Sequence, residues 1–275
     1  IRNRGELFED AVEEAINICR RSDLPGQLSH LAPRPYAPEG AFENVLKTVN
    51  LAREVEGIRL GIDTFPDVWG PGMVVALLPP WVYEGDRSEV LNRLADPQTI
   101  ENCRDHFYDP TNYLLRLGGL EMFYLSSSIA HPELVGKNFI EIGEVFGCDP
   151  VEGIFKLVLA DGADFYNVML RHIFATSDDL DLLLSEPYCS VESDGVVTAT
   201  DGALSNFTMN RSSFCYTIRF LDEYVFKREM FSLEEAIRKM TSLPADSAGL
   251  SKRGRVAPGM DADLVVLDPD KLSDK

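Results

Sequence analysis

The sequence has few of the features that would tie it to nucleic acid or to a membrane. Lys and Arg number only 26 against 45 Asp and Glu, which gives a formal net charge of −19. A surface this acidic repels phosphate backbones and anionic lipid headgroups, so we expect neither as a partner. The most apolar run, residues 72–82, is too short to cross a bilayer and contains Pro79 and Pro80. The composition favours a protein that acts on small molecules.

Cysteines are also scarce, and their five positions are scattered without a CxxC pair. An odd, dispersed set predicts reduced thiols in a cytoplasmic protein. The sequence has no basic, apolar segment of the kind that directs secretion. It opens at Ile1 without an initiator Met and stops at Lys275 just after a strand-like segment. We therefore expect a fragment, with part of its chemistry outside these residues.

Helical and strand-like patterns alternate along most of the chain. The apolar spacing predicts helices at residues 5–21, 42–54, 138–147, 150–160, 177–185 and 213–228. Short apolar runs predict strands at residues 27–31, 59–65, 121–126 and 189–192. Strand, helix and strand at this spacing are typical of parallel β/α units. Residues 69–113 are rich in proline and interrupt the alternation, which indicates an insertion on the side where barrel enzymes place active-site loops.

The last part of the chain has clear local signals. Ser232 and Glu235 have the spacing of a capping box at the start of a helix that ends before Pro244. Residues 263–268 read as a β-strand. A strand that follows the last barrel helix needs a partner elsewhere, so we expect it to belong to a small separate sheet.

Three polar residues stand at or near the ends of predicted strands: His30, Asp63 and Asp194. Parallel strands bring such side chains to one shared edge, where His and Asp can hold a divalent metal. The metal would lower the pKa of bound water, and a carboxylate would move its proton. On spacing alone, we favour a hydrogen-bonded structural histidine for His30 and a simple Ser-Asp-Gly turn for Asp194.

A long C-terminal stretch adds a family resemblance. Its matching segments are residues 234–245, 249–250, 253–255, 258–260 and 262–269. Together they closely resemble the C-terminal region of the D-aminoacylases (N-acyl-D-amino-acid deacylases) of the metal-dependent amidohydrolase superfamily. Thinner matches continue upstream in the same order at residues 27–30, 63–66, 77–81 and 193–195.

The resemblance implies an α/β fold, the rear part of a TIM-type (β/α)8 barrel followed by the start of a small accessory β-sandwich. We expect the partial barrel to cover residues 1–250 and the β-sandwich to begin at residues 251–275. The resemblance also implies zinc as one or two metal ions, whereas the residues themselves support only a divalent metal.

The resemblance assigns roles to individual residues. His30 aligns with a histidine metal ligand, and Asp194 with the aspartate that contacts metal and water and acts as general base and then acid. Arg211 aligns with an arginine implied to hold the substrate carboxylate, a task that suits its planar guanidinium. The sequence departs from the family at Ala32, where a Lys is usual, and at Asp67, where a Tyr is usual. Asp67 thus occupies a substrate-binding position with a different residue type.

The expected function is metal-dependent hydrolysis of the amide bond of N-acyl-D-amino acids or related small amides. Two alternatives stay open: a cyclic amidohydrolase of the dihydroorotase or hydantoinase kind, and a homologue that binds ligand without catalysis. The fragment alone is expected to be inactive, because one His and one Asp do not complete a metal site. The sequence gives no oligomeric state.

Overall fold

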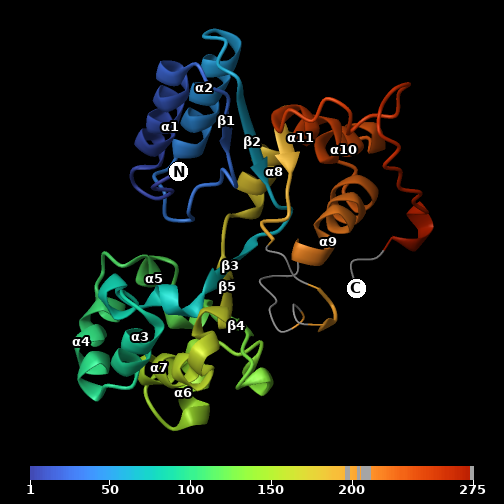
Figure 1. Ribbon diagram of the computed structural model, residues 1–275. Coiled ribbons are helices and arrows are strands. Elements are labelled where there is room, and N and C mark those ends of the chain that lie inside the picture. Colours follow the sequence, from blue (N-terminus) through green and yellow to red (C-terminus); the bar gives the residue numbers. More distant parts are fainter. Residues whose placement is uncertain (196–198, 203–204, 206–211, 273–275) are drawn as a thin grey trace. The chain divides into compact units, whose positions relative to one another are not determined.

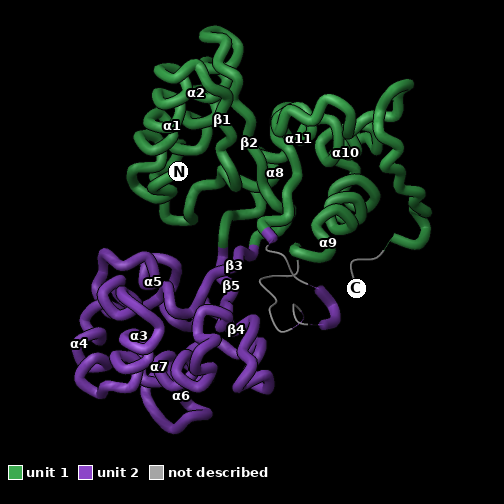
Figure 2. Tube along the Cα trace, in the orientation of Figure 1, with its two compact units in different colours: residues 1–68, 174–194, 211–275 green, residues 69–173, 195–210 purple. Residues whose placement is uncertain are grey.

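The chain folds into two compact units, each built around its own sheet (Figures 1 and 2). The computed structural model describes residues 1–195, 199–202, 205 and 212–272. The first unit comprises residues 1–68, 174–194 and 211–275, and the second comprises residues 69–173 and 195–210. Among the described residues, no helix combines the length and the apolar character that a bilayer crossing requires.

The first unit contains a parallel three-stranded sheet in the order β1-β2-β6. The strands are β1 (Gly26–Leu28), β2 (Leu60–Thr64) and β6 (Cys189–Val191). Ile62 of β2 lies opposite Leu28 of β1 on one side and opposite Cys189 of β6 on the other. Helix α2 (Ala41–Glu54) connects β1 to β2, and α8 (Ser177–Ser185) precedes β6. The predicted parallel β/α units are therefore confirmed.

Amphipathic helices cover this sheet. Helix α1 (Phe8–Ser22) places Phe8, Val12 and Ile16 on one face at four-residue spacing, and all three are fully buried. They pack with the buried face of α2, where the rings of Phe8 and Phe42 lie 6.2 Å apart between centroids. Helix α2 thus connects β1 to β2, and α1 completes the apolar core that packs against these strands.

A second apolar cluster forms behind β6. Helix α9 (Ser212–Arg219) continues into the π-helix η7 (Phe220–Lys227), and α10 (Leu233–Met240) and α11 (Ser242–Ser247) follow. Ser232 caps α10 by accepting the backbone N–H of Glu235 at 3.2 Å, which confirms the Ser232 half of the predicted capping box. The Glu235 carboxylate pairs with Arg238 at 2.7 Å.

The second unit contains an antiparallel sheet in the order β3-β5-β4. Its strands are β3 (Trp69–Met73), β4 (Tyr124–Ser127) and β5 (Met169–Ile173). Its helices are α3 (Arg87–Leu94), α4 (Pro97–Tyr108), α5 (Tyr113–Arg116), α6 (Phe139–Phe146) and α7 (Pro150–Ala160).

Two expectations change in this unit. The strand predicted at residues 121–126 joins this antiparallel sheet, whereas we expected it to be one of the parallel strands. The interruption predicted for residues 69–113 forms one unit that continues to Ile173. The reason is that β3 and β4 both pair with β5, a strand whose partners lie about 45 to 100 residues away in the sequence, beyond the reach of a local pattern.

The expected strand at residues 263–268 is wrong for this structure. No described strand pairs with this segment, and Val265 and Val266 are 88% and 98% exposed. A strand is stabilised by a neighbour that takes up its backbone N–H and C=O groups, and the described residues supply none here. The division at residue 251 stays a prediction.

Candidate active site

Four acidic or histidine residues lie at or just beyond the carboxyl ends of the strands of the parallel sheet. His30 follows β1 by two residues, Asp63 lies within β2, and Glu192 and Asp194 follow β6. Because the three strands are parallel, their carboxyl ends share one edge. His30 follows β1 and Asp194 follows β6, and the strand order β1-β2-β6 brings both residues to that edge. The structure thus brings together the two residues predicted to hold a metal.

His30 and Asp194 share an uncommon backbone conformation. Their φ angles are +40° and +45°, in the left-handed region that residues other than glycine rarely adopt. Such conformations cost on the order of 1–3 kcal/mol each and concentrate at active sites, where surrounding contacts hold them. The structure assigns a turn at Ser29 and His30 but none at Ser193-Asp194-Gly195, so the turn expected there is wrong, and the strained residue is Asp194 itself.

Asp63 holds the His30 turn in place. Its Oδ1 accepts the backbone N–H of His30 at 2.8 Å and the hydroxyl of Ser29 at 2.8 Å. Its Oδ2 accepts the side-chain amide of Gln27 at 2.7 Å. Both oxygens of this buried carboxylate are thus occupied within the protein. Asp63 is oriented toward the backbone that presents the histidine.

Glu192 plays the corresponding part beside Asp194. Its Oε2 accepts the backbone N–H of Asp194 at 2.9 Å, while its Oε1 is buried without a hydrogen-bond partner among the described residues. Burial, followed by the charges of Asp63 and Asp194, raises the pKa of Glu192 to about 7. The sequence analysis missed Glu192, although its position two residues before Asp194 and just after β6 was visible.

Arg4 is a second functional candidate that the sequence analysis missed. Its Nη1 donates to the carbonyl of His30 at 3.2 Å, and its guanidinium lies 4.3 Å from the centre of the Phe174 ring. Burial, reinforced by nearby Arg34, lowers the pKa of Arg4, which still stays protonated at neutral pH. A positive charge thus stands next to the His30 and Asp194 pair.

The local environment sets the charge of both predicted ligands. Burial, followed by the charge of Arg4, lowers the pKa of His30, so its imidazole is neutral at pH 7. Neutral imidazole is the form that binds a metal. Its Nδ1 is buried with no hydrogen-bond partner among the described residues. Burial raises the pKa of Asp194, whereas the charges of His30 and Arg4 oppose that rise.

The pair fits a metal in kind but does not complete a metal site. An imidazole nitrogen and a carboxylate oxygen are ordinary ligands for zinc and similar ions. Within the described ranges, no three His, Cys, Asp or Glu side chains come together as a candidate metal cluster. His30 and Asp194 would therefore contribute two ligands of a larger set.

The predicted substrate contacts are placed differently. Asp67 is mostly buried, and its Oδ2 lies 3.5 Å from Nε of Arg219, which also donates to the carbonyl of Pro66 at 2.8 Å. Its negative charge is thus matched by a cation from α9. Arg211 lies outside the described residues.

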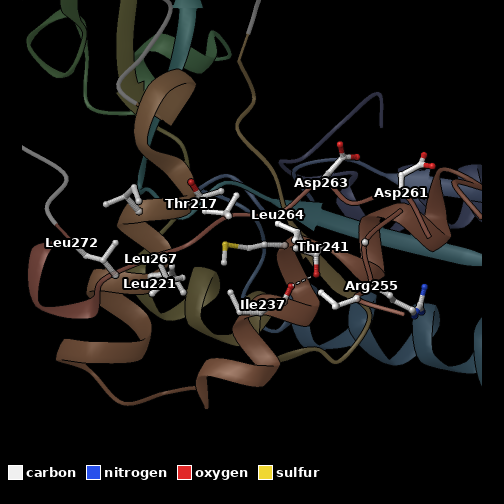
Figure 3. Close-up of a pocket in the computed structure, with 15 residues that line it drawn as sticks. Thr217, Leu221, Ile237, Thr241, Arg255, Asp261, Asp263, Leu264, Leu267 and Leu272 are labelled. Carbon is white, nitrogen blue, oxygen red and sulfur yellow. Dashed lines mark hydrogen bonds between the residues drawn. The ribbon is translucent and has the colours of Figure 1, made fainter. Parts of the chain in front are cut away.

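A separate cavity of about 410 Å³ lies between α9, η7, α10 and the segment 254–272 (Figure 3). Leu221, Ile237 and Leu267 form part of its apolar lining. None of the four strand-end residues lines it. The candidate active site is therefore the group of residues at the strand ends, and this cavity is distinct from it.

Comparison with known proteins gives one consistent group of relatives. Residues 188–275 match the amidohydrolase family. The whole chain is 28% identical over 278 aligned residues to an N-acyl-D-glutamate deacylase of Alcaligenes xylosoxydans xylosoxydans. It is 45% identical over 275 residues to a D-aminoacylase of the same organism. The chain spans 45% of the length of each of these two relatives.

The fold is also shared with solved structures. One is an N-acyl-D-glutamate deacylase from Bordetella bronchiseptica, crystallised with zinc and a phosphonate inhibitor that mimics the tetrahedral intermediate. The TM-score is 0.71 at 24% sequence identity, and the match covers all of this chain and 47% of that one. The parallel β/α units with their appended helices are therefore those of this group of structures.

Proposed function

We propose that this chain, whose residues 188–275 match the amidohydrolase family, is part of a protein that hydrolyses the amide bond of N-acyl-D-amino acids. The observation that supports this most directly is the placement of His30 and Asp194 just after β1 and β6, at the same edge of one parallel sheet. Both residues have a left-handed backbone, and burial shifts the pKa of each, lowering that of His30 and raising that of Asp194. The relatives named for D-glutamate and D-amino-acid substrates supply the substrate class.

His30 and Asp194 would hold zinc together with ligands outside the described residues. When bound, zinc lowers the pKa of a water molecule and polarises a carbonyl group. His30 is suited to its part because its imidazole is neutral at pH 7. The carboxylate of Asp194 takes the proton of the attacking water and passes it to the leaving nitrogen.

The substrate contacts belong to the same proposal. Arg211 holds the carboxylate of the N-acyl amino acid through its planar guanidinium. Asp67 contributes to substrate binding through Arg219, because its Oδ2 lies 3.5 Å from Nε of Arg219. Ala32 and Asp67 stand where the family usually has a lysine and a tyrosine. The substrate carboxylate is therefore bound by a different set of side chains.

The test is Asp194→Asn in the full-length, zinc-loaded protein. A positioned general base contributes about 10²- to 10⁴-fold to the rate, so we expect kcat for an N-acetyl-D-amino acid to fall by at least 100-fold with an unchanged circular dichroism spectrum. Asp178→Asn, at an exposed position in the first turn of α8, is the matched control and should keep full activity.

Two results would contradict the proposal. Asp194→Asn activity within about tenfold of wild type, or roughly 1.4 kcal/mol of barrier, would show that the base is misassigned. Turnover of cyclic ureides with none of N-acyl-D-amino acids would instead support a cyclic amidohydrolase.

A further inference from the structure

Two carboxylates at the strand ends, buried Asp63 and half-buried Glu192, contact the backbone of the two candidate ligands. Asp63 accepts the N–H of His30 at 2.8 Å, and Glu192 accepts the N–H of Asp194 at 2.9 Å. In each case the residue whose N–H is held has a left-handed backbone. The same arrangement, a carboxylate that accepts the N–H of a left-handed residue, therefore occurs twice at the site.

We infer that Asp63 and Glu192 are positioning residues, which hold the strained backbone of His30 and Asp194 so that imidazole and carboxylate face one shared point. This inference rests on the proposed function, in which His30 and Asp194 are metal ligands. It assigns Asp63 and Glu192 no proton transfer and no metal bond.

The contacts of Asp63 direct both of its oxygens toward neighbouring protein groups, which suits a positioning role. Oδ1 accepts two hydrogen bonds, and Oδ2 accepts one from Gln27. The Gln27 side chain lies flat across Gly61, where a Cβ atom would approach its Oε1 to 2.1 Å. The β2 strand thus leaves room for the amide that fixes Asp63, and Asp63 in turn fixes His30.

The backbone of His30 is held at both its N–H and its C=O group. Asp63 takes its N–H, whereas Arg4 donates to its C=O at 3.2 Å. The backbone before Asp194 is braced in a similar way, because the hydroxyl of Ser212 at the start of α9 donates to the carbonyl of Ser193 at 2.8 Å. Such a support is what a left-handed residue needs to persist.

The test compares Asp63→Ala with Asp63→Asn in the full-length protein, stripped of metal and titrated with zinc against a chelating dye. Asn keeps an oxygen for the N–H of His30 and the hydroxyl of Ser29, and Gln27 can rotate to present its Oε1 to the new amide. We expect Asp63→Ala to weaken zinc affinity by 10- to 100-fold, the usual effect of losing a group that orients a ligand. Asp63→Asn should stay within about threefold of wild type.

Glu192 is tested in the same way. Glu192→Gln keeps an acceptor for the N–H of Asp194 and should bind zinc within about threefold of wild type, whereas Glu192→Ala should lose at least tenfold. In active preparations, both Ala variants should lower kcat much more than they raise KM. Thermal melting of each variant separates this effect from a general loss of fold.

Two results would overturn the positioning role: zinc affinity of Asp63→Ala within threefold of wild type, or equal losses in Asp63→Ala and Asp63→Asn. The second result would show that the charge itself is required, as for a ligand or base. Zinc affinity is measured without substrate, so its loss in Asp63→Ala supports positioning even if the wild type hydrolyses no N-acyl-D-amino acid. A wild-type protein that hydrolyses no N-acyl-D-amino acid would refute only the proposed activity.

Discussion

Lys239 on α10 is the one Lys or Arg side chain among the described residues that is almost wholly buried, at 1% exposure. Its Nζ donates to the carbonyls of Glu186 at 2.6 Å and Cys189 at 3.3 Å, and lies 3.8 Å from the Glu235 carboxylate. These contacts join α10 to the end of α8 and to the start of β6, the strand that leads to Asp194. Lys239→Met keeps most of the side-chain volume and removes the ammonium group.

The size of the effect follows from these contacts. Each hydrogen bond from a charged donor contributes about 1.5–3 kcal/mol, but removing the ammonium also ends the unfavourable burial of its charge. The carbonyl of Glu186 keeps the backbone N–H of Cys189 at 3.0 Å, so the carbonyl of Cys189 loses most. Leaving one buried carbonyl without its Lys239 donor costs about 1–3 kcal/mol of folding free energy. We therefore expect Lys239→Met to lower the free energy of unfolding by that amount.

Urea unfolding of the full-length protein at pH 7 measures this change. Lys271→Met is the matched control, because the Lys271 side chain is 82% exposed, and it should change stability by less than about 0.5 kcal/mol. Equal stability of Lys239→Met and wild type would refute the reasoning, since it would mean that the hydrogen bonds only offset the desolvation of the charge.

Burial also lowers the pKa of Lys239 below its usual 10.5. Between the lowered and the usual value, the unfolded chain therefore binds one more proton at this residue than the folded chain does. The stability contribution of this residue rises with pH through that window. A wild-type minus Lys239→Met difference that falls with pH there would contradict this sign.

Further predictions concern thiols and a turn. Cys103 and Cys189 are buried, which raises the pKa of both thiols, so a thiol reagent at pH 8 should label them only after denaturation; rapid labelling of either in the native protein would contradict this. Gly254→Ala should lower the unfolding free energy by about 2 kcal/mol or more, because φ is +80° and the new Cβ would lie 2.8 Å from the carbonyl oxygen of Thr241. Gly259→Ala, with φ +85° and open space around it, is its control and should lose only about 1 kcal/mol in the same urea titration; equal losses would show that crowding at Gly254 has no effect.

The helices of the first unit could be predicted closely from the sequence. The spacing of Phe8, Val12 and Ile16 predicts one buried face of α1, and all three are buried. The strand positions also follow from short apolar runs, with boundaries that differ by a few residues. Periodicity succeeds here because it depends on neighbours within one or two turns of the same element.

Strand pairing was beyond the same kind of inference. Residues 121–126 look like another strand of the parallel series, yet β4 runs antiparallel to β5. Residues 263–268 have a strand sequence and no strand partner in the described part of the chain. A strand's partner, unlike its apolar pattern, is set by contacts far away in the sequence.

For the candidate site, the sequence by itself determined that His30 and Asp194 stand just after strands, and the parallel order of those strands made their convergence predictable. Only the tertiary structure decided what supports them. Asp63 and Glu192 accept backbone N–H groups of left-handed residues, Arg4 donates to the carbonyl of His30, and Lys239 is buried. Each of these contacts depends on which polar groups come together when the chain packs. A buried polar group must find its partner in three dimensions, and no local pattern records that choice.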